Sequence, residues 1–280
     1  MHLPSTTSEP SDAILKAMGR LLSPEFLRWF SVQTMQNFRK WKDHILEKNT
    51  AKGTIVLNPW FTCHPSTLQV LAECLKGMLW EEFNIIFVDP ATRPWLNNVD
   101  TIEKGWIWLY ANLQKIHSDH EKNGNMILVG HSIAWPLIIR SILESKASRV
   151  QGITQRSLPD TMGIHMIAPP LGNVPLAHLP LSYIFPALID LRKKKIFTEA
   201  EITTFLEGIW SLVIHQTMVD SLVPHVSQGL KGMYPDMSQG LLQRVEQVVY
   251  PDFNHLTGIN GKGVWKLATS IANRIQQRSN

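Results

Sequence analysis

Six short apolar runs, separated by longer segments, constrain the fold of this chain most strongly. The runs are rich in Val and Ile, which predicts strands that are buried on both faces. They occupy residues 54–60, 83–89, 126–130, 163–170, 211–217 and 245–251. Helix-like segments lie between them at residues 66–80, 101–122 and 133–148. Strands that alternate with helices predict a doubly wound, mostly parallel α/β sheet with helices on both sides.

The sequence predicts one large domain that is preceded by an N-terminal extension. Of the 280 residues, 44% are hydrophobic and 18% are charged, and no linker-like stretch divides them, so one large domain is expected over residues 51–280. Residues 1–11 are polar and are expected to form a loose tail. Residues 12–50 predict an N-terminal helical extension, because Ser23-Pro24-Glu25 is typical of a helix start and apolar residues follow at helical spacing.

One connection between predicted strands is unusually long and is expected to carry structure of its own. It spans about residues 171–210 and contains Thr198-Glu199-Ala200-Glu201, a capping box that predicts the start of a helix. The apolar stretch before it ends in the basic run 192–195 and is compatible with a second helix. The last segment predicts a helix with one apolar stripe, formed by Val264, Leu267, Ile271 and Ile275.

Ser132 lies in Gly130-His131-Ser132-Ile133-Ala134, directly between a predicted strand and a predicted helix. A serine exposed on so sharp a turn needs small residues two positions before and after it, and Gly130 and Ala134 are small. The pattern alone is weak evidence, because it arises by chance about 0.2 times in a chain of this length. An ordinary serine on a turn is therefore the alternative interpretation.

Two more polar residues follow later predicted strands. Sites in open α/β sheets form at the carboxyl ends of the strands. Asp220 and His255 lie just past such ends, so Ser132, Asp220 and His255 occur in the chain order associated with this turn. The alternatives to these two residues are Asp89, Asp160 and Asp190 for the acid, and His215 and His225 for the base. We interpret His131 as a packing and hydrogen-bonding residue of the turn.

The segments around these residues resemble the α/β-hydrolase superfamily. "LVGHSIA" is similar to its nucleophile elbow, "DSLVP" to its acid loop and "DFNHLTG" to its histidine loop, and the resemblance runs from about residue 54 to the end. The insertion at 171–210 stands where the family commonly carries a helical cap. The resemblance implies a lipase- or esterase-like serine hydrolase of apolar carboxylic esters, with thioesters possible. Ser132 would be the nucleophile, His255 the general base and Asp220 its orienting acid.

The resemblance also implies an oxyanion hole. One donor would be the backbone N–H of Ile133, and the second that of Phe61, with Trp60 as runner-up and the Asn58 amide as a further alternative. Trp60 stands where many relatives carry glycine, and the neighbouring Pro59 has no N–H to offer. Trp60 and Trp135 are expected to line the substrate pocket. The rival interpretation is a catalytically weakened hydrolase-like fold that binds an apolar ligand or a protein.

Composition excludes several other function classes. Cys63 and Cys74 are too few for a disulfide framework and lack metal-site spacing, so no metal is expected, and the triad itself needs no cofactor. No signal peptide or membrane span is predicted, and a cytoplasmic location follows. The net charge of +4 is modest, and no nucleic-acid-binding module occurs. Residues 192–195 suit either transient contact of the cap with a membrane surface or a solvated helix end. The oligomeric state cannot be predicted.

Overall fold

The computed structural model divides into two units, Met1–Leu46 and Glu47–Asn280. The residues that it describes all belong to the second unit; they are 51–58, 68–79, 82–88, 102–119, 125–150, 158, 162–171, 174, 196–220, 223, 225–255 and 263–279. The predicted tail and N-terminal helical extension, residues 1–11 and 12–50, lie outside the described residues. Both therefore stay predictions.

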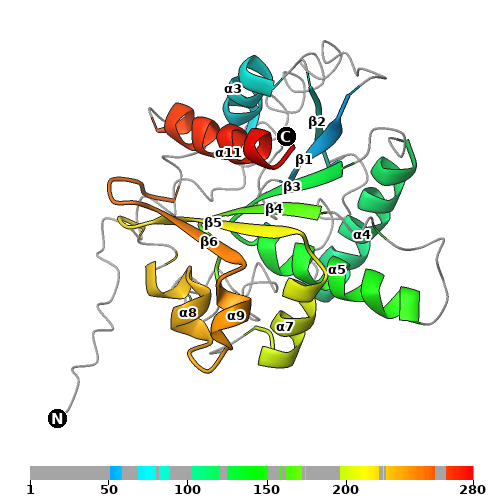
Figure 1. Ribbon diagram of the computed structural model, residues 1–280, viewed down its shortest axis with the longest axis vertical. Helices are drawn as coiled ribbons and strands as arrows, with labels where there is room; N and C mark the ends of the chain where they lie inside the picture. The colour runs from blue at the N-terminus through cyan, green and yellow to red at the C-terminus, as the bar shows by residue number, and fades with distance from the viewer. Residues whose placement is uncertain are drawn as a thin grey trace, which may run out of the picture. The chain divides into compact units, whose positions relative to one another are not determined.

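A six-stranded, all-parallel sheet forms the centre of the second unit (Figure 1). Its strands are β1 Gly53–Asn58, β2 Phe83–Phe87, β3 Asn125–His131, β4 Met162–Ile167, β5 Ser211–Thr217 and β6 Val245–Tyr250. Their order across the sheet is β2-β1-β3-β4-β5-β6. Each of the six predicted runs thus forms a strand, and the predicted doubly wound parallel sheet is confirmed.

Helices cover both faces of this sheet, as Figure 1 shows. Those between the first three strands and after β3 and β6 are α3 Gln69–Leu79, α4 Ile102–Asp119, α5 Ala134–Val150 and α11 Val264–Ser279. α3 and α11 lie side by side on one face, and α4 and α5 pack together on the other. The core between sheet and helices is aliphatic and aromatic, with Trp135, Phe197 and Phe205 among its large buried side chains. No helix in the described part of the chain is long and apolar enough to cross a membrane.

The prediction that every strand is buried on both faces is wrong for one of them. All residues of β1 and β5 are buried, as expected for inner strands. β6, by contrast, buries its two end residues and leaves Gln247 and Val249 exposed. It is the last strand in the sheet order and pairs with β5. Part of this apolar run therefore meets solvent, with Val249 47% exposed.

The connection from β4 to β5 contains the helix that its capping box predicts. Helix α7 spans Glu199–Glu207. The Thr198 side chain accepts a hydrogen bond from the Glu201 backbone N–H, and the Glu201 carboxylate accepts one from the Thr198 N–H in return. Residues 175–195, including the basic run 192–195, lie outside the described residues. The second helix of the predicted cap and its contact with a membrane surface therefore stay predictions.

The strand order makes the position between β1 and β3 different from the rest of the sheet. From β1 the chain moves outward to β2 and then returns to the other side of β1 to form β3. The connections on either side of the β1–β3 pair thus leave in opposite directions, and ligands of open α/β sheets bind at such a switch point, beyond the carboxyl ends of the strands. Asn58 and Gly130 are paired there at the ends of β1 and β3. Ser132 follows within two residues.

Candidate active site

Ser132 follows β3 in a backbone conformation that few side chains adopt. Its φ angle is 54°, and the only other positive φ among the described non-glycine residues belongs to Ala168. The turn is held by two backbone bonds: the Ser132 N–H donates to the Ile167 carbonyl at 2.8 Å, and the Trp135 N–H donates to the Ser132 carbonyl at 3.2 Å. A left-handed conformation costs an L-residue about 1–2 kcal/mol, so the surrounding structure holds Ser132 in a strained turn.

Gly130, one of the two small residues that flank this turn, has little room for a larger side chain. A Cβ atom on Gly130 would lie 2.7 Å from Ile138 Cδ1 and 3.5 Å from Ala134 Cβ. Strand β3 and helix α5 therefore approach each other closely at the turn. This close approach is what aims the Ser132 side chain beyond the end of the sheet.

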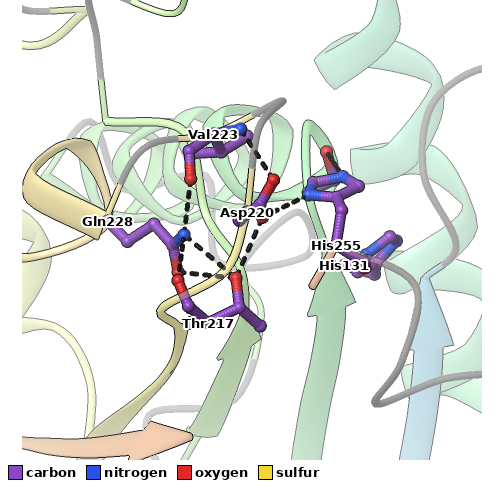
Figure 2. Close-up of polar contacts among 7 residues, drawn as sticks. His131, Thr217, Asp220, Val223, Gln228 and His255 are labelled. Atoms are coloured by element: carbon purple, nitrogen blue, oxygen red, sulfur yellow. Dashed lines mark hydrogen bonds and ion pairs between the residues drawn. The ribbon is translucent and has the colours of Figure 1, made fainter. Parts of the chain in front are cut away.

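Ser132, His255 and Asp220 form a continuous chain of hydrogen bonds. Ser132 Oγ lies 2.9 Å from His255 Nε2, and His255 Nδ1 lies 2.8 Å from Asp220 Oδ2. Because a carboxylate only accepts, His255 Nδ1–H donates to Asp220, and the Nε2 lone pair is left to accept the hydroxyl proton of Ser132. All three residues are buried, with exposed fractions of 5%, 5% and 7% in the order given above. Figure 2 shows the contact between Asp220 and His255.

The Asp220 carboxylate is held ionised by its hydrogen bonds. Burial alone raises its pKa, but the hydrogen bond and charge of His255, the Val223 N–H and the Thr217 hydroxyl lower the pKa by more. Val223 N–H donates to Asp220 Oδ1 at 2.9 Å, and Thr217 Oγ1 donates to Asp220 Oδ2 at 2.9 Å (Figure 2). The net result is a pKa below the usual value of an aspartate. An anionic carboxylate next to the imidazole follows at neutral pH.

The loops that carry the acid and the histidine brace one another. Met218 N–H donates to the Tyr250 carbonyl at 3.1 Å, and Val219 N–H donates to the Phe253 carbonyl at 3.0 Å. The rings of Tyr250 and Phe253 stack with their centroids 4.5 Å apart. Two loops from neighbouring strands therefore support each other, and the Asp220–His255 distance depends on both.

His131 contacts the backbone of His255. Its Nε2 lies 2.9 Å from the His255 carbonyl oxygen, and the two imidazole centroids are 4.8 Å apart. Burial, with a smaller contribution from the charge of His255, lowers the pKa of His131 to about 3. His131 is therefore neutral and donates from Nε2, which agrees with its interpretation as a packing and hydrogen-bonding residue.

Comparison with known proteins identifies the fold. No protein-family model and no curated protein matches the sequence. Among solved structures, carboxyl esterase 2 from the mycorrhizal fungus Tuber melanosporum matches 80% of this chain and 76% of its own, at 16% identity and a TM-score of 0.53. The chain has the α/β-hydrolase fold. A structure described for LipS and LipT, two metagenome-derived lipolytic enzymes, matches 81% of this chain and 95% of its own at 13% identity and a TM-score of 0.51. A structure from a study of two Rhizomucor miehei esterases matches 82% and 76% at 14% identity and a TM-score of 0.51.

The other predicted site residues of this α/β-hydrolase fold occupy different environments. Ile133 is buried, and no hydrogen bond is recorded for its backbone N–H within the described residues. Trp135 is also buried; its Nε1–H donates to the Pro170 carbonyl at 2.9 Å, and its ring packs edge-on against Phe197 and Phe205. These contacts make Trp135 a core residue, and its role in a substrate pocket stays a prediction. Trp60 and Phe61 lie outside the described residues.

The competing histidines are not the ones bonded to the serine. His215 lies inside β5, where its Nε2 contacts His165 at 3.1 Å and its Nδ1 contacts the Tyr250 hydroxyl at 3.1 Å. His225 begins the short 3-10 helix η8, His225–Ser227. Asp89, Asp160 and Asp190 lie outside the described residues. Of the histidines considered from the sequence, His255 is the one bonded to Ser132.

Sequence reasoning missed Thr217 and Gln228, which both belong to the surroundings of the acid. Thr217 is the last residue of β5, and Gln228 directly follows η8. A polar residue at a strand end three positions before the candidate acid was a signal that could have indicated Thr217. Nothing in the sequence indicates that the chain folds back to put Gln228 beside it. The described residues contain no group of three or more His, Cys, Asp or Glu side chains that could hold a metal ion.

Proposed function

We propose that this protein is a serine hydrolase that cleaves carboxylic esters with an apolar acyl or alcohol part, with Ser132 as nucleophile, His255 as general base and Asp220 as orienting acid. The observation that carries the proposal is the buried hydrogen-bond chain from Ser132 Oγ through both nitrogens of His255 to Asp220 Oδ2, with lengths of 2.9 and 2.8 Å. In this hydrogen-bond chain His255 can accept the proton of Ser132, and the anionic Asp220 can stabilise the protonated His255.

The chemistry follows from these protonation states. Ser132 Oγ attacks the ester carbonyl carbon while its proton moves to His255 Nε2, and the carbonyl oxygen becomes the tetrahedral oxyanion. The imidazolium then returns the proton to the departing alcohol oxygen as the C–O bond breaks, which leaves an acyl group on Ser132. Water repeats the two steps and releases the acid. Asp220 keeps Nδ1 protonated and offsets the positive charge of the imidazolium.

The oxyanion needs donors that are free before the reaction. The Ile133 N–H meets this requirement, because no acceptor is recorded for it in the described part of the chain and it directly follows the nucleophile. The second donor is proposed to come from the segment after β1, with Phe61 N–H first and Trp60 N–H second. β1 and β3 are neighbours at the switch point, so that segment starts beside the nucleophile turn.

Ester hydrolysis is also the activity of the proteins with similar folds. The names of the three solved structures given above describe esterases or lipolytic enzymes. At their low identities this likeness supports an ester substrate only as a class. The apolar acyl or alcohol part is proposed because one of these structures is described for lipolytic enzymes.

Reaction with a fluorophosphonate probe tests the proposal, because the probe phosphonylates only a serine that has been activated. We expect labelling of the wild-type protein and none of Ser132→Ala. Ser141→Ala is the matched control: Ser141 is a buried serine in α5 whose hydroxyl donates to the Leu137 carbonyl at 2.8 Å. This control should label like wild type. A folded wild-type protein that does not label would refute the proposal.

A substrate panel then identifies the ester class. Hydrolysis of p-nitrophenyl esters with acyl chains of increasing length, and of the matching thioesters, is measured for wild type and Ser132→Ala. We expect activity that rises with acyl length before it levels off and that disappears in the variant. Equal rates for the two proteins would show that the turnover does not come from Ser132.

A further inference from the structure

Thr217 and Gln228 join the two ends of the loop that carries Asp220. Both are buried, with exposed fractions of 2% and 0%. Gln228 Oε1 accepts the Thr217 N–H at 2.8 Å, and Gln228 Nε2 donates to the Thr217 carbonyl at 3.1 Å and to the Val223 carbonyl at 2.6 Å. One side chain thus bonds the backbone on both sides of Asp220 (Figure 2).

These partners fix which way the Gln228 amide points. The Thr217 N–H can only donate, so the amide atom facing it must be oxygen. The carbonyls of Thr217 and Val223 can only accept, so the atom facing them must be nitrogen. The orientation of the amide therefore follows from the backbone alone, and rotating it by half a turn would break all three bonds.

The fixed amide also determines where the Thr217 hydroxyl sends its proton. Gln228 Nε2 also lies 3.0 Å from Thr217 Oγ1, so one of its two N–H groups is shared between that oxygen and the Thr217 carbonyl. The hydroxyl proton can then go to Asp220 Oδ2 at 2.9 Å or to Gln228 Oε1 at 3.3 Å. The carboxylate is nearer and is charged, so it is the better acceptor. Asp220 Oδ2 is also the oxygen that accepts His255 Nδ1–H.

We propose that Thr217 and Gln228 are positioning residues that act through Asp220: Gln228 orients the Thr217 hydroxyl, and that hydroxyl holds Asp220 Oδ2 in line with His255 while sharing its negative charge. This inference rests on the proposed function, because the triad must be catalytic for it to affect a rate. Two effects follow. The carboxylate cannot turn away from the imidazole, and its stabilisation of the protonated imidazole is reduced by the competing hydroxyl.

Thr217→Val tests the first link because valine has the shape of threonine but no hydroxyl. We measure kcat and KM for the best ester, and the rate of phosphonylation, from pH 5 to 9. Without the hydroxyl, Asp220 Oδ2 stabilises the imidazolium more strongly. The acidic limb of the pH–rate profile, where the rate falls as the pH falls, should therefore move to higher pH by about half to one unit. The maximal kcat should fall about tenfold through lost orientation, with KM changed less than twofold.

Two further variants separate this effect from a loss of stability. Thr217→Ser keeps the hydroxyl and should return the limb to its wild-type position. Thr54→Val is the matched control, because Thr54 is a buried threonine in β1 whose hydroxyl has no hydrogen-bond partner among the described residues. It should leave both the limb and kcat unchanged. An unmoved limb in a folded Thr217→Val protein, or a limb that Thr217→Ser does not restore, would overturn the inference.

Gln228→Met tests the second link through non-additivity. If Gln228 acts by orienting the Thr217 hydroxyl, the double variant should shift the limb no further than Thr217→Val alone. Independent, additive shifts would show that Gln228 has no such role. The methionine leaves buried backbone groups of Thr217 and Val223 unpaired, so each protein is first checked by thermal unfolding. Thr217→Val decides the first link even if Gln228→Met does not fold.

A measurement that does not depend on enzymatic activity separates this inference from the proposed function. The proton on His255 Nδ1 is followed by NMR during a pH titration of wild type and Thr217→Val, with His131, whose ring contacts His255, identified by His131→Asn. A titration midpoint that moves to higher pH in Thr217→Val supports the inference even if the probe does not label Ser132. Coinciding titrations would refute it, whatever the outcome of labelling.

Discussion

Three buried histidines predict that the protein loses stability steeply in mild acid. His131, His165 and His215 are each at most 3% exposed. Burial is the main cause that lowers the pKa of His131 and of His165 to about 3, and it lowers the pKa of His215 well below the usual value. Positive charge on Arg274 lowers the pKa of His165 and His215 further. All three are therefore neutral in the folded protein at pH 5 to 7.

The contacts of these histidines are suited to neutral rings. His165 Nδ1 and His215 Nε2 lie 3.1 Å apart, so one of the two must be without a proton to accept from the other. His131 Nδ1 is buried and has no hydrogen-bond partner in the part of the chain that the structure describes. Protonating any of these rings would place a positive charge in a buried environment or leave a buried N–H unpaired, so the folded protein resists it.

The size of the effect follows from proton linkage. An unfolded histidine takes up a proton below about pH 6.5, whereas these folded ones stay neutral, so the unfolded state binds more protons and stability falls as the pH falls. Each histidine contributes a slope of about 1.4 kcal/mol per pH unit, and three give about 4 kcal/mol per unit. At pH 5 the accumulated loss is about 6 kcal/mol, which is comparable to the total stability of many domains. The loss begins near pH 6.5 and continues toward the folded pKa values.

Urea unfolding followed by tryptophan fluorescence, at intervals from pH 5 to 8, measures this slope. We expect a net uptake of about three protons on unfolding near pH 5.5. His165→Met should reduce the slope by about one third, whereas His117→Asn, which alters a partly exposed histidine of α4, should leave it unchanged. A slope of one proton or less between pH 5 and 6.5 would refute the reasoning.

Three predictions concern positions where the backbone or its neighbours decide between glycine and a larger residue, and all are measured by the same urea unfolding. Ser132→Gly should be about 1 kcal/mol more stable than Ser132→Ala, because glycine adopts the positive φ angle without strain; equal stabilities would contradict a strained turn. Gly130→Ala should cost about 1–3 kcal/mol through its contact with Ile138 Cδ1, and Ile138→Val in the same chain should recover most of it. Gly53→Ala should destabilise, because its Cβ would lie 2.6 Å from a backbone oxygen of β3, while Gly77→Ala, with open space around it in α3, should stabilise by about 1 kcal/mol.

Much of the fold could be predicted from the sequence because the signals are local. The run at 211–217 matches β5 residue for residue, because its apolar centre, Leu212, Val213 and Ile214, is typical of a buried inner strand. The capping box at Thr198 predicted the start of α7, because the two residues satisfy each other's backbone within one turn. The exposure of β6 could not be predicted in this way. It depends on the position of the strand at the end of the sheet order.

The candidate site likewise contains residues that could be predicted from the sequence and residues that could not. Ser132, Asp220 and His255 could be proposed because each follows a strand, and parallel strands bring their ends to one edge of the sheet. The clamp formed by Thr217 and Gln228 could not, because it depends on the length and path of the acid loop. The bond from His131 to the His255 backbone likewise depends on a path, that of the loop after β6.

The neutral state of His131 links the stability of the site to its chemistry. The carbonyl of His255 can only accept, so His131 holds its proton on Nε2 and leaves Nδ1 as a buried lone pair. A protonated His131 would lie 4.8 Å, centroid to centroid, from the His255 ring, which becomes positive in the proposed mechanism. Burial removes that opposing charge while keeping the hydrogen bond that holds the His255 backbone. The burial that is predicted to make the protein sensitive to acid therefore also keeps a charge on His131 away from the imidazolium of the proposed mechanism.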